Sequence, residues 1–506
     1  MLKRVKLLLV AYLLTLTITC AQKIMKLDFD PSSYQTKTLT LNEKTFKVRA
    51  YEKIIYMEKP VDTAYQVMNI YIPEEYFNGK SIGTYTAENA PIFFPNQIGG
   101  YMPAKPASTE MQVMGMRPPS NGQEQQIRLG HQRPPESTGP RRNTVLEALS
   151  RGYVVASAGA RGRTNGDGKA PAGIVDLKAA IRYLKFNDKK IPGDAGKIIS
   201  NGTSAGGAMS ALLGATGNHP DYEMYLKALG AANAKDNIFA VSSYCPITNL
   251  DHADIAYEWQ FYGIHSYKRR DPFANDQSPQ NLSAEQIAIS KDLKEAFPTY
   301  LNSLQLKDRQ GKILTLDGNG DGNFKELVKS YVVASAQIAL NSGKDLSAHQ
   351  WITIKGGRVI DLDWNNYIVY MERQKTPPAF DALDESTGEN QLFGTATSDK
   401  LHFTKYGQLH SSIAGSTIAD QKIIKMMNPM YYITDPKTQP AAHWRIRHGS
   451  KDKDTGLAIS VMLSTLLENK GYDVNLELPW DVPHSGDYDL NELFEWMDSI
   501  VQRKAK

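Results

Sequence analysis

The 506-residue sequence predicts an α/β fold: a mostly parallel central sheet with helices on both faces, interrupted by a large insertion. Three observations predict it. Strand-like and helix-like segments alternate before residue 216, they alternate again after residue 443, and the interval between has a different texture. Such alternation is typical of a parallel sheet whose strands are joined by helices. We therefore expect one core built from residues 21–245 and 428–506, with 246–427 as an inserted lid domain.

The first part of the core opens with β-rich stretches. Residues 44–72 alternate apolar and polar side chains, which predicts antiparallel opening strands. A short apolar run between turn residues, 90–96, predicts a buried strand. The pattern then continues with five elements: helix 145–151, strand 153–159, helix 174–187, strand 197–201 and helix 208–216.

The second part of the core repeats this rhythm with strand 443–449, helix 457–471, strand 474–479 and an amphipathic helix 490–504. The insertion between the two parts is polar and aromatic, with helical pieces and few buried strands. Residues 103–142 are rich in Pro, Gln, Met and Ser and have no sustained period, which predicts an exposed loop or local insertion.

The N-terminus predicts export. Three basic residues precede an apolar run at residues 7–18, which is too short to span a bilayer, so residues 1–20 are expected to be a signal peptide. Cys20 ends this segment and is a candidate for lipid attachment. Two outcomes stay open: a lipid anchor at Cys20 in the cell envelope, or cleavage near Ala21 to give a periplasmic or secreted protein.

Charge and cysteine content narrow the class of partner. The formal net charge is +4, and three of its cations lie in the signal segment, so the charge gives no reason to expect nucleic acid or an acidic membrane surface. Membrane contact is expected only through Cys20. Cys245 is the other cysteine, which excludes an intramolecular disulfide in the mature chain, and we expect it to be a buried small side chain. No cofactor or metal is expected.

Ser204 lies at the centre of a G-x-S-x-G pattern, NGTSAGG. The glycines suit a strand-to-helix turn that is too tight for a neighbouring Cβ, and this turn holds the serine hydroxyl exposed above the sheet. The pattern alone is weak, but here a strand-like run precedes it and a helical run follows it. Together they predict a serine nucleophile in an α/β-hydrolase fold.

A serine hydroxyl needs a histidine base and a carboxylate that orients this base, and in this fold they follow in the order Ser, acid, His. His484 lies in a turn directly after strand 474–479, where the base is expected. Asp452 and Asp454 both follow strand 443–449, and from position alone either could be the acid.

The oxyanion of the reaction needs two backbone amides. Ala205, directly after the nucleophile, supplies one by its position. The second normally comes from the loop after an earlier strand, and the glycine pair in NQIGGYM makes Ile98, Gly99 and Gly100 the candidates.

Two glycine-rich stretches suggest other chemistry only weakly. Residues 317–324 fit the first part of a calcium loop, but the twelfth position is Val328 instead of glutamate. Residues 159–168 contain glycines and arginines but do not fit the G-x-x-x-x-G-K-[ST] pattern of a phosphate-binding loop, so we expect a turn-rich loop near the rim of the active site.

Seven motifs together resemble the bacterial tannases, or tannin acyl hydrolases, over most of the chain after Ala50: NIYIPEEYFNG, PIFFPNQIGGYMP, NGTSAGGAMSALLGATGNHPDY, KTPPAFD, ENQLFG, RHGSKDKDT and DVPHSGDYDL. The resemblance implies an α/β-hydrolase with a large inserted lid. It also implies a triad of Ser204, Asp452 and His484, which selects Asp452 as the acid. Residues 103–142 cannot be aligned.

The resemblance further implies the substrate, a small-molecule galloyl ester. In that family a lysine, a glutamate and a second aspartate bind the three phenolic hydroxyls of the galloyl ring. By motif these are Lys375, Glu389 and Asp454. Without the resemblance, Lys375 and Glu389 read as solvated surface residues. The expected function is hydrolysis of gallates and hydrolysable tannins through an acyl-enzyme.

Other functions fit the same serine motif. A feruloyl or general carboxylesterase would use the same triad but accept esters without adjacent ring hydroxyls. A serine peptidase is a further alternative, although the chain has no propeller repeat at its N-terminus. A catalytically silent binding module on a hydrolase scaffold is the alternative from a different class.

Overall fold

A nine-stranded mixed sheet runs through the computed structural model, which describes residues 24–110, 143–268 and 278–503. The strands lie in the order β1-β2-β3-β5-β4-β6-β7-β12-β13. The pairs among β1, β2, β3 and β5 are antiparallel and the remaining pairs are parallel. The bounds are β1 Gln35–Leu41, β2 Lys44–Ile54, β3 Met68–Pro73, β4 Pro91–Pro95, β5 Val154–Ala158, β6 Asp194–Thr203, β7 Ala240–Tyr244, β12 His443–Arg447 and β13 Asp473–Glu477.

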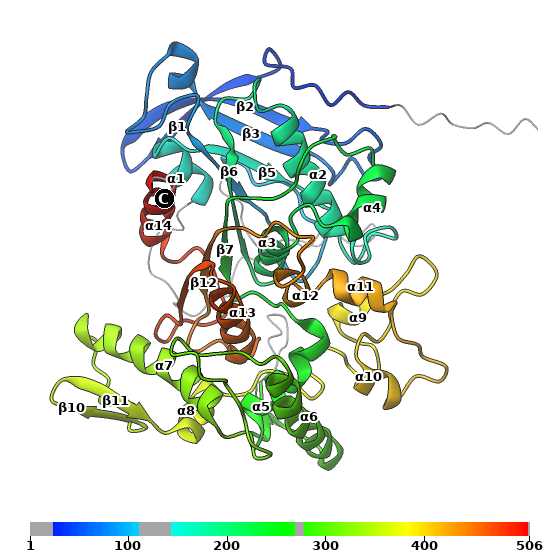
Figure 1. The fold of residues 1–506 in the computed structure, drawn as a ribbon, viewed down its shortest axis with the longest axis vertical. Helices are drawn as coiled ribbons and strands as arrows, with labels where there is room; N and C mark the ends of the chain where they lie inside the picture. The colour runs from blue at the N-terminus through cyan, green and yellow to red at the C-terminus, as the bar shows by residue number, and fades with distance from the viewer. Residues whose placement is uncertain (1–23, 111–142, 269–277, 504–506) are drawn as a thin grey trace, which may run out of the picture.

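Helices cover both faces of this sheet, which confirms the predicted fold class. Figure 1 shows α1 and α14, which are far apart in the sequence, side by side on one face, and α2, α3 and α13 on the other. The core helices are α1 Thr144–Ser150, α2 Ala172–Phe186, α3 Ala205–Ala215, α4 Glu223–Ala228, α13 Leu457–Asn469 and α14 Leu490–Gln502.

The residue pattern explains how these helices pack. α14 buries Leu490, Leu493, Phe494 and Met497, the spacing of one helical face. Its Phe494 ring lies 5.6 Å from the ring of Phe93 in β4. α3 is built almost entirely of small buried residues, so it can approach β7 closely. The central strands that carry the site are therefore packed by helices on both faces.

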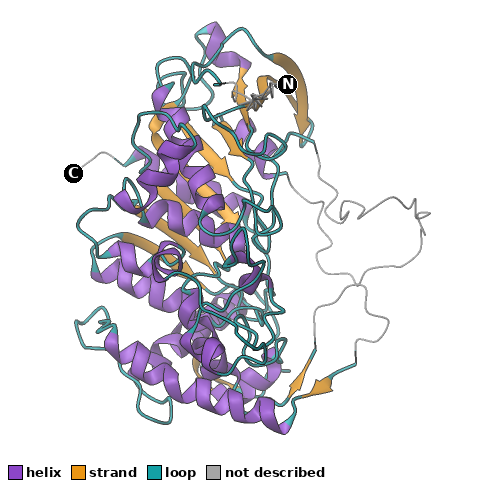
Figure 2. Cartoon of the chain, turned by 90° about the vertical axis from the view of Figure 1, so that its right-hand side faces the viewer, coloured by secondary structure: helices purple, strands orange, loops and turns teal. Residues whose placement is uncertain are grey.

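The chain leaves the sheet after β7 and returns at β12, and the segment between fills the lower part of the molecule in Figures 1 and 2. The domain limits expected for the insertion, 246–427, fall inside this interval, and they stay a prediction. Rings of Trp259, Phe297 and Phe324 form part of its core. Its elements are α5 Ala253–Phe261, β8 Ser266–Tyr267, β9 Gln280–Asn281, α6 Ala284–Ser303, α7 Asn323–Asn341, β10 Ile352–Lys355, β11 Arg358–Leu362, α8 Trp364–Met371, α9 Gly388–Leu392, α10 Lys405–Leu409, α11 Gln421–Met426 and α12 Met430–Ile433.

Two strands of the sheet were not expected from the sequence. β1 (QTKTLTL) is a polar, largely exposed edge strand, and β7 (AVSSY) is fully buried but contains two serines, so neither has a clear hydrophobic pattern. The signal segment 1–20, with Cys20, and residues 111–142 of the stretch that begins at residue 103 lie outside the described residues. None of the described helices is long and apolar enough to span a bilayer.

Candidate active site

Ser204 occupies the turn between β6 and α3 with φ 60° and ψ −122°, a conformation that non-glycine residues rarely adopt. Neighbouring backbone crowds this turn: a Cβ on Gly202 would lie 2.3 Å from the carbonyl oxygen of Gly206. The Ser204 amide donates to the carbonyl oxygen of Tyr244 at the end of β7 (2.9 Å), which anchors the turn to the sheet. The strained turn therefore holds the hydroxyl at the carboxyl end of the strands.

Three of the predicted residues form a continuous chain of hydrogen bonds. His484 Nε2 lies 2.9 Å from Ser204 Oγ, and His484 Nδ1 lies 2.8 Å from Asp452 Oδ2. The other carboxylate oxygen, Asp452 Oδ1, accepts the amides of Asp454 (2.8 Å) and Thr455 (3.3 Å). Of the two candidate acids, Asp452 is therefore the one that contacts the histidine, while Asp454 points elsewhere.

The charges of this pair support each other. Burial disfavours a charge on the His484 ring, but the facing Asp452 carboxylate raises the pKa of His484 well above its ordinary value. Burial also opposes the charge on Asp452, yet the two histidines that face it, His484 and His448, hold the pKa of Asp452 below its ordinary value. His448 Nε2 lies 3.3 Å from Asp452 Oδ2 without hydrogen-bond geometry. Asp452 thus stays ionised and favours a protonated His484.

The loop that carries His484 is locked against the Ser204 turn. A Cβ on Gly486 would lie 1.9 Å from Oγ1 of Thr203, so only glycine permits this approach. Next to it, Asp487 Oδ1 accepts a hydrogen bond from Asn201 Nδ2 (2.9 Å) at the end of β6. These contacts set the distance between base and nucleophile.

The predicted oxyanion loop lies against the start of α3. Asn96 Nδ2 donates to the carbonyl oxygen of Gly206 (3.0 Å), so this asparagine, which the sequence reading passed over, holds the loop to the turn. Ala205 is the first residue of α3, and its amide has no acceptor within the helix. The amides of Gly99 and Gly100 make no hydrogen bond with the described residues. The loop is thus in place to offer free donors, and their role stays a prediction.

The residues that the resemblance assigned to the galloyl ring gather beside Asp452. Lys375 Nζ lies 2.8 Å from Asp454 Oδ1 and 3.9 Å from the centroid of the Phe380 ring. Burial raises the pKa of Glu389, and the positive charge of Lys375 opposes this rise. The ammonium of Lys375 and the carboxylate of Asp454 therefore form an ion pair next to Asp452, and the place of Glu389 in the ring site stays a prediction.

The loop that carries Lys375 is anchored by a buried ion pair that sequence reasoning missed. Arg373 and Glu258 on α5 are fully buried and paired, and Arg373 Nε donates to the Lys375 carbonyl oxygen (2.7 Å). The Tyr257 hydroxyl accepts the Lys375 amide (3.1 Å). The sequence offers no local signal for this anchor, because its partners lie more than 100 positions apart.

Arg163 is a second residue that sequence reasoning missed, in the glycine-rich loop 159–168. Its Nε donates to the carbonyl oxygen of Gly100 (2.8 Å), and its guanidinium also bonds Gln391 on α9. The Arg163 amide donates to the Tyr101 carbonyl oxygen (2.8 Å). This side chain joins the oxyanion loop to α9, the helix that carries Glu389.

The potential metal ligands are few. In the described part of the chain, the only cluster of three ligand groups is Cys245, Asp452 and His484, with ligand atoms within 4.8 Å of one another. Two of them already form the hydrogen-bonded chain, so a bound cation would compete with it. In the loop 317–324, Asp317 Oδ1 accepts the amides of Asn319 and Asp321, and Val328 is buried in the core. That loop is a turn into α7.

The mixed sheet, the strand-to-helix turn at Ser204 and the histidine after β13 define an α/β-hydrolase. The BD-FAE family model matches residues 131–285. A tannase structure from Fusobacterium nucleatum is 48% identical, with a TM-score of 0.84, and the match covers 94% of this chain and 100% of that chain. The tannin acyl hydrolase from Lactobacillus plantarum is 43% identical, with a TM-score of 0.85 and coverage of 94% and 99%.

The same values of identity and coverage hold for a tannin acyl hydrolase in complex with ethyl gallate, with a TM-score of 0.84. The chain therefore belongs to the bacterial tannase family, which confirms the resemblance, and it is a carboxylic ester hydrolase. A curated relative, Esterase LipC from Mycobacterium tuberculosis, is 45% identical over 56 residues, a match that spans 11% of this chain and only 14% of LipC.

Proposed function

We propose that this enzyme hydrolyses galloyl esters through an acyl-enzyme on Ser204. The observation that carries the proposal is a hydrogen bond between the triad and the residues assigned to the ring: the Asp454 amide donates to the Asp452 carboxylate. Asp454 pairs with Lys375, and Asp452 pairs with His484. A ring held by Lys375 and Asp454 thus lies next to the reacting groups. Family membership, and a relative crystallised with ethyl gallate, support the choice of substrate.

The distances support a two-step reaction. Ser204 Oγ bonds to the ester carbonyl carbon while His484 Nε2 takes the hydroxyl proton. The electrons of the carbonyl double bond move onto its oxygen, and this oxyanion accepts hydrogen bonds from the amides of Ala205 and the Gly99–Gly100 loop. The carbonyl then re-forms, the bond to the alcohol breaks, and His484 gives its proton to the leaving oxygen. Water repeats the sequence, releases the acid and restores Ser204.

The ring is recognised through charge-assisted hydrogen bonds. Lys375 donates to a phenolic oxygen, and the carboxylates of Asp454 and Glu389 accept from phenolic hydroxyls. An ester without these hydroxyls would displace water from the three side chains without offering them hydrogen bonds in return, which costs free energy in the transition state. The three side chains therefore set the preference for a trihydroxy ring.

Turnover of three esters tests the proposal. Wild type is expected to hydrolyse methyl gallate far faster than methyl ferulate or methyl benzoate, and Ser204→Ala to lose activity on all three. Ser499→Ala, at an exposed position of α14, is the matched control. Equal rates on the three esters would contradict the galloyl proposal and favour a general carboxylesterase. Absence of labelling of Ser204 by a fluorophosphonate would instead favour a silent binding module.

The insertion and the N-terminus carry two further proposals. The insertion supplies Lys375 and Glu389 and is proposed to act as a lid that completes the site over the substrate. Export is proposed from residues 1–20, with Cys20 as the candidate lipid anchor. Cell fractionation of the full chain and of Cys20→Ala separates the outcomes: recovery in the cytoplasm contradicts export, and equal membrane recovery of both chains contradicts the anchor.

A further inference from the structure

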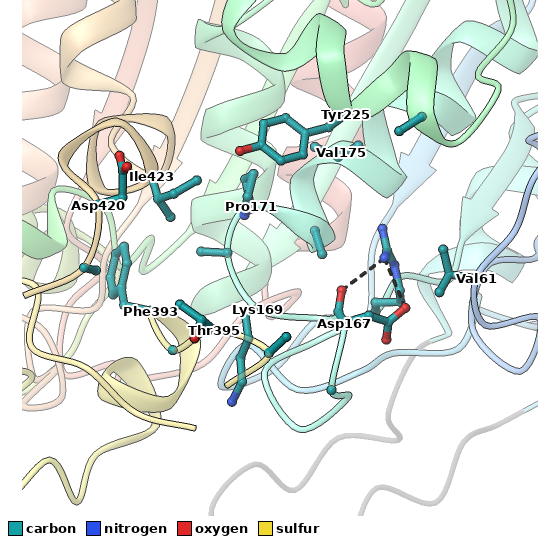
Figure 3. A pocket seen from close by; sticks show the side chains of 18 of the residues that line it. Val61, Asp167, Lys169, Pro171, Val175, Tyr225, Phe393, Thr395, Asp420 and Ile423 are labelled. Atoms are coloured by element: carbon teal, nitrogen blue, oxygen red, sulfur yellow. Dashed lines mark hydrogen bonds and ion pairs between the residues drawn. The ribbon is translucent and has the colours of Figure 1, made fainter. Parts of the chain in front are cut away.

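A cavity of about 510 Å³ lies away from the proposed active site. It is lined by α2, α4, the start of α11, the loop before α2 and the chain that follows α9, and neither the triad nor the galloyl-binding residues line it. This volume falls within the range of small-molecule sites. Figure 3 shows its walls: Val61, Pro171, Val175, Tyr225, Phe393 and Ile423.

The lining is apolar with a few polar groups at the edge. The Tyr225 hydroxyl makes no hydrogen bond with the described part of the chain. Asp420 and Asp167 are exposed and line the same cavity. An apolar interior with a small number of placed polar groups is typical of a site for an aromatic ligand that carries hydroxyls.

The charges around the cavity select a neutral ligand. Its two cations are already neutralised: Arg161 pairs with Asp176 (2.8 Å) and also with Asp167 (3.3 Å), and Lys169 pairs with Asp399 (2.6 Å). The three groups around Arg161 keep one net negative charge, and Asp167 Oδ1 is free of the contact with Arg161. Asp420 forms no ion pair with the described residues, and its Oδ1 accepts the Lys422 amide (2.7 Å) at the start of α11. The edge of the cavity is therefore acidic, which favours hydrogen-bond donors and disfavours an anion such as a free phenolic carboxylate.

We propose that this cavity binds a second neutral aromatic ring with several hydroxyls, such as an esterified galloyl group. The choice of this ligand rests on the proposed function. The ring packs between the apolar walls, and its hydroxyls donate to Asp420 and Asp167 and exchange hydrogen bonds with Tyr225. A tannin carries several such rings, so the same chemistry can come from a second ring of the substrate under attack or from a separate molecule.

The cavity wall is joined to α9, the helix that carries Glu389. Phe393 lines the cavity and its amide donates to the Glu389 carbonyl oxygen (3.1 Å), one helical turn away. The Ala170 amide donates to the carbonyl oxygen of Leu392 (2.8 Å), which ties the other wall of the cavity to the same helix. A ring bound here contacts the residues that hold the galloyl-binding helix in place.

Binding to an inactive chain tests the site directly. Equilibrium dialysis of methyl gallate against Ser204→Ala is expected to give two bound molecules per chain. Adding Ala228→Trp, which fills the cavity from the exposed end of α4, is expected to leave one, and Met224→Trp on the same helix but outside the cavity is expected to leave two. Ala396→Trp, from an exposed lining position, repeats the test if Ala228→Trp lowers the melting temperature.

Each outcome separates this site from the proposed function. Lys375→Met in the Ser204→Ala chain removes the catalytic-side molecule only, so loss of that molecule alone leaves the cavity site standing. One bound molecule in Ser204→Ala that survives Ala228→Trp overturns the cavity site and leaves the galloyl proposal intact. Free gallate at the same concentration is expected not to occupy the cavity, and occupancy by it equal to that of methyl gallate overturns the charge argument.

Kinetics of otherwise wild-type chains identify the source of the ring. A KM that rises about tenfold in Ala228→Trp for a glucose ester with several galloyl groups, with no change for methyl gallate, shows that a second ring of the same molecule is held. Equal changes for both esters show a separate molecule. No change for either ester, together with unchanged dialysis, overturns the proposal.

Discussion

Replacement of Lys375 by methionine separates recognition of the ring from the chemistry of the ester. Methionine keeps the apolar stem over the Phe380 ring but removes the ammonium that lies 2.8 Å from Asp454. A hydrogen bond to a charged group is worth about 2 kcal/mol, and this corresponds to about a 30-fold loss in kcat/KM for methyl gallate. Methyl benzoate has no ring hydroxyl, so its kcat/KM is expected to change less than about twofold.

The assay compares kcat/KM for both esters in wild type, Lys375→Met and the control Lys453→Met. Lys453 lies between Asp452 and Asp454 in the chain, but its ammonium pairs with Glu372, outside the proposed ring site. The reasoning is refuted if Lys375→Met loses activity on both esters equally, because the lysine would then act on the reaction or on the fold instead of on the ring. It is also refuted if neither ester is affected.

Three further predictions follow from the contacts around the site. Asp452→Asn removes the charge that raises the pKa of His484. Because His484 must be neutral to accept a proton, the acid limb of the pH profile of kcat/KM should move to lower pH, and kcat should fall about 10⁴-fold. An acid limb that does not move contradicts this prediction. Arg163→Ala frees the oxyanion loop from α9, so steady-state kinetics should show kcat reduced about fivefold to tenfold with an unchanged melting temperature. An unchanged kcat argues against a role of Arg163 in positioning the oxyanion loop. Arg373→Met leaves Glu258 buried without a cation, so denaturant unfolding should show a free energy of unfolding lower by about 3–5 kcal/mol. The double variant Arg373→Met, Glu258→Gln should recover part of this loss. Equal stability of the single and double variants contradicts an unpaired charge as the cause.

The sequence by itself determined the class of fold and the nature of the nucleophile. The alternation of strands and helices depends on local periodicity, and the turn at Ser204 depends on glycines within two positions of it. His484 was found in the same way, from its place after a strand. Such signals are local, because a few neighbouring residues suffice to produce the geometry.

Position along the chain could not choose between Asp452 and Asp454, because both follow the same strand. The resemblance named Asp452 as the acid, and in the structure Asp452 contacts His484 while Asp454 pairs with Lys375. Lys375 and Glu389 had no local signal either, and only the resemblance named them. β7 was missed because its serines break the apolar pattern of a buried strand.

Asn96, Arg163 and Arg373 show what only the tertiary structure decided. Each acts through partners more than 60 positions away in the chain, and each contact exists because packing of the sheet, the glycine-rich loop and the insertion brings these segments together. The same packing forms the cavity beside α2 and α4. Long-range contacts of this kind depend on how faces of different elements fit, and this fit leaves no period or motif in the sequence.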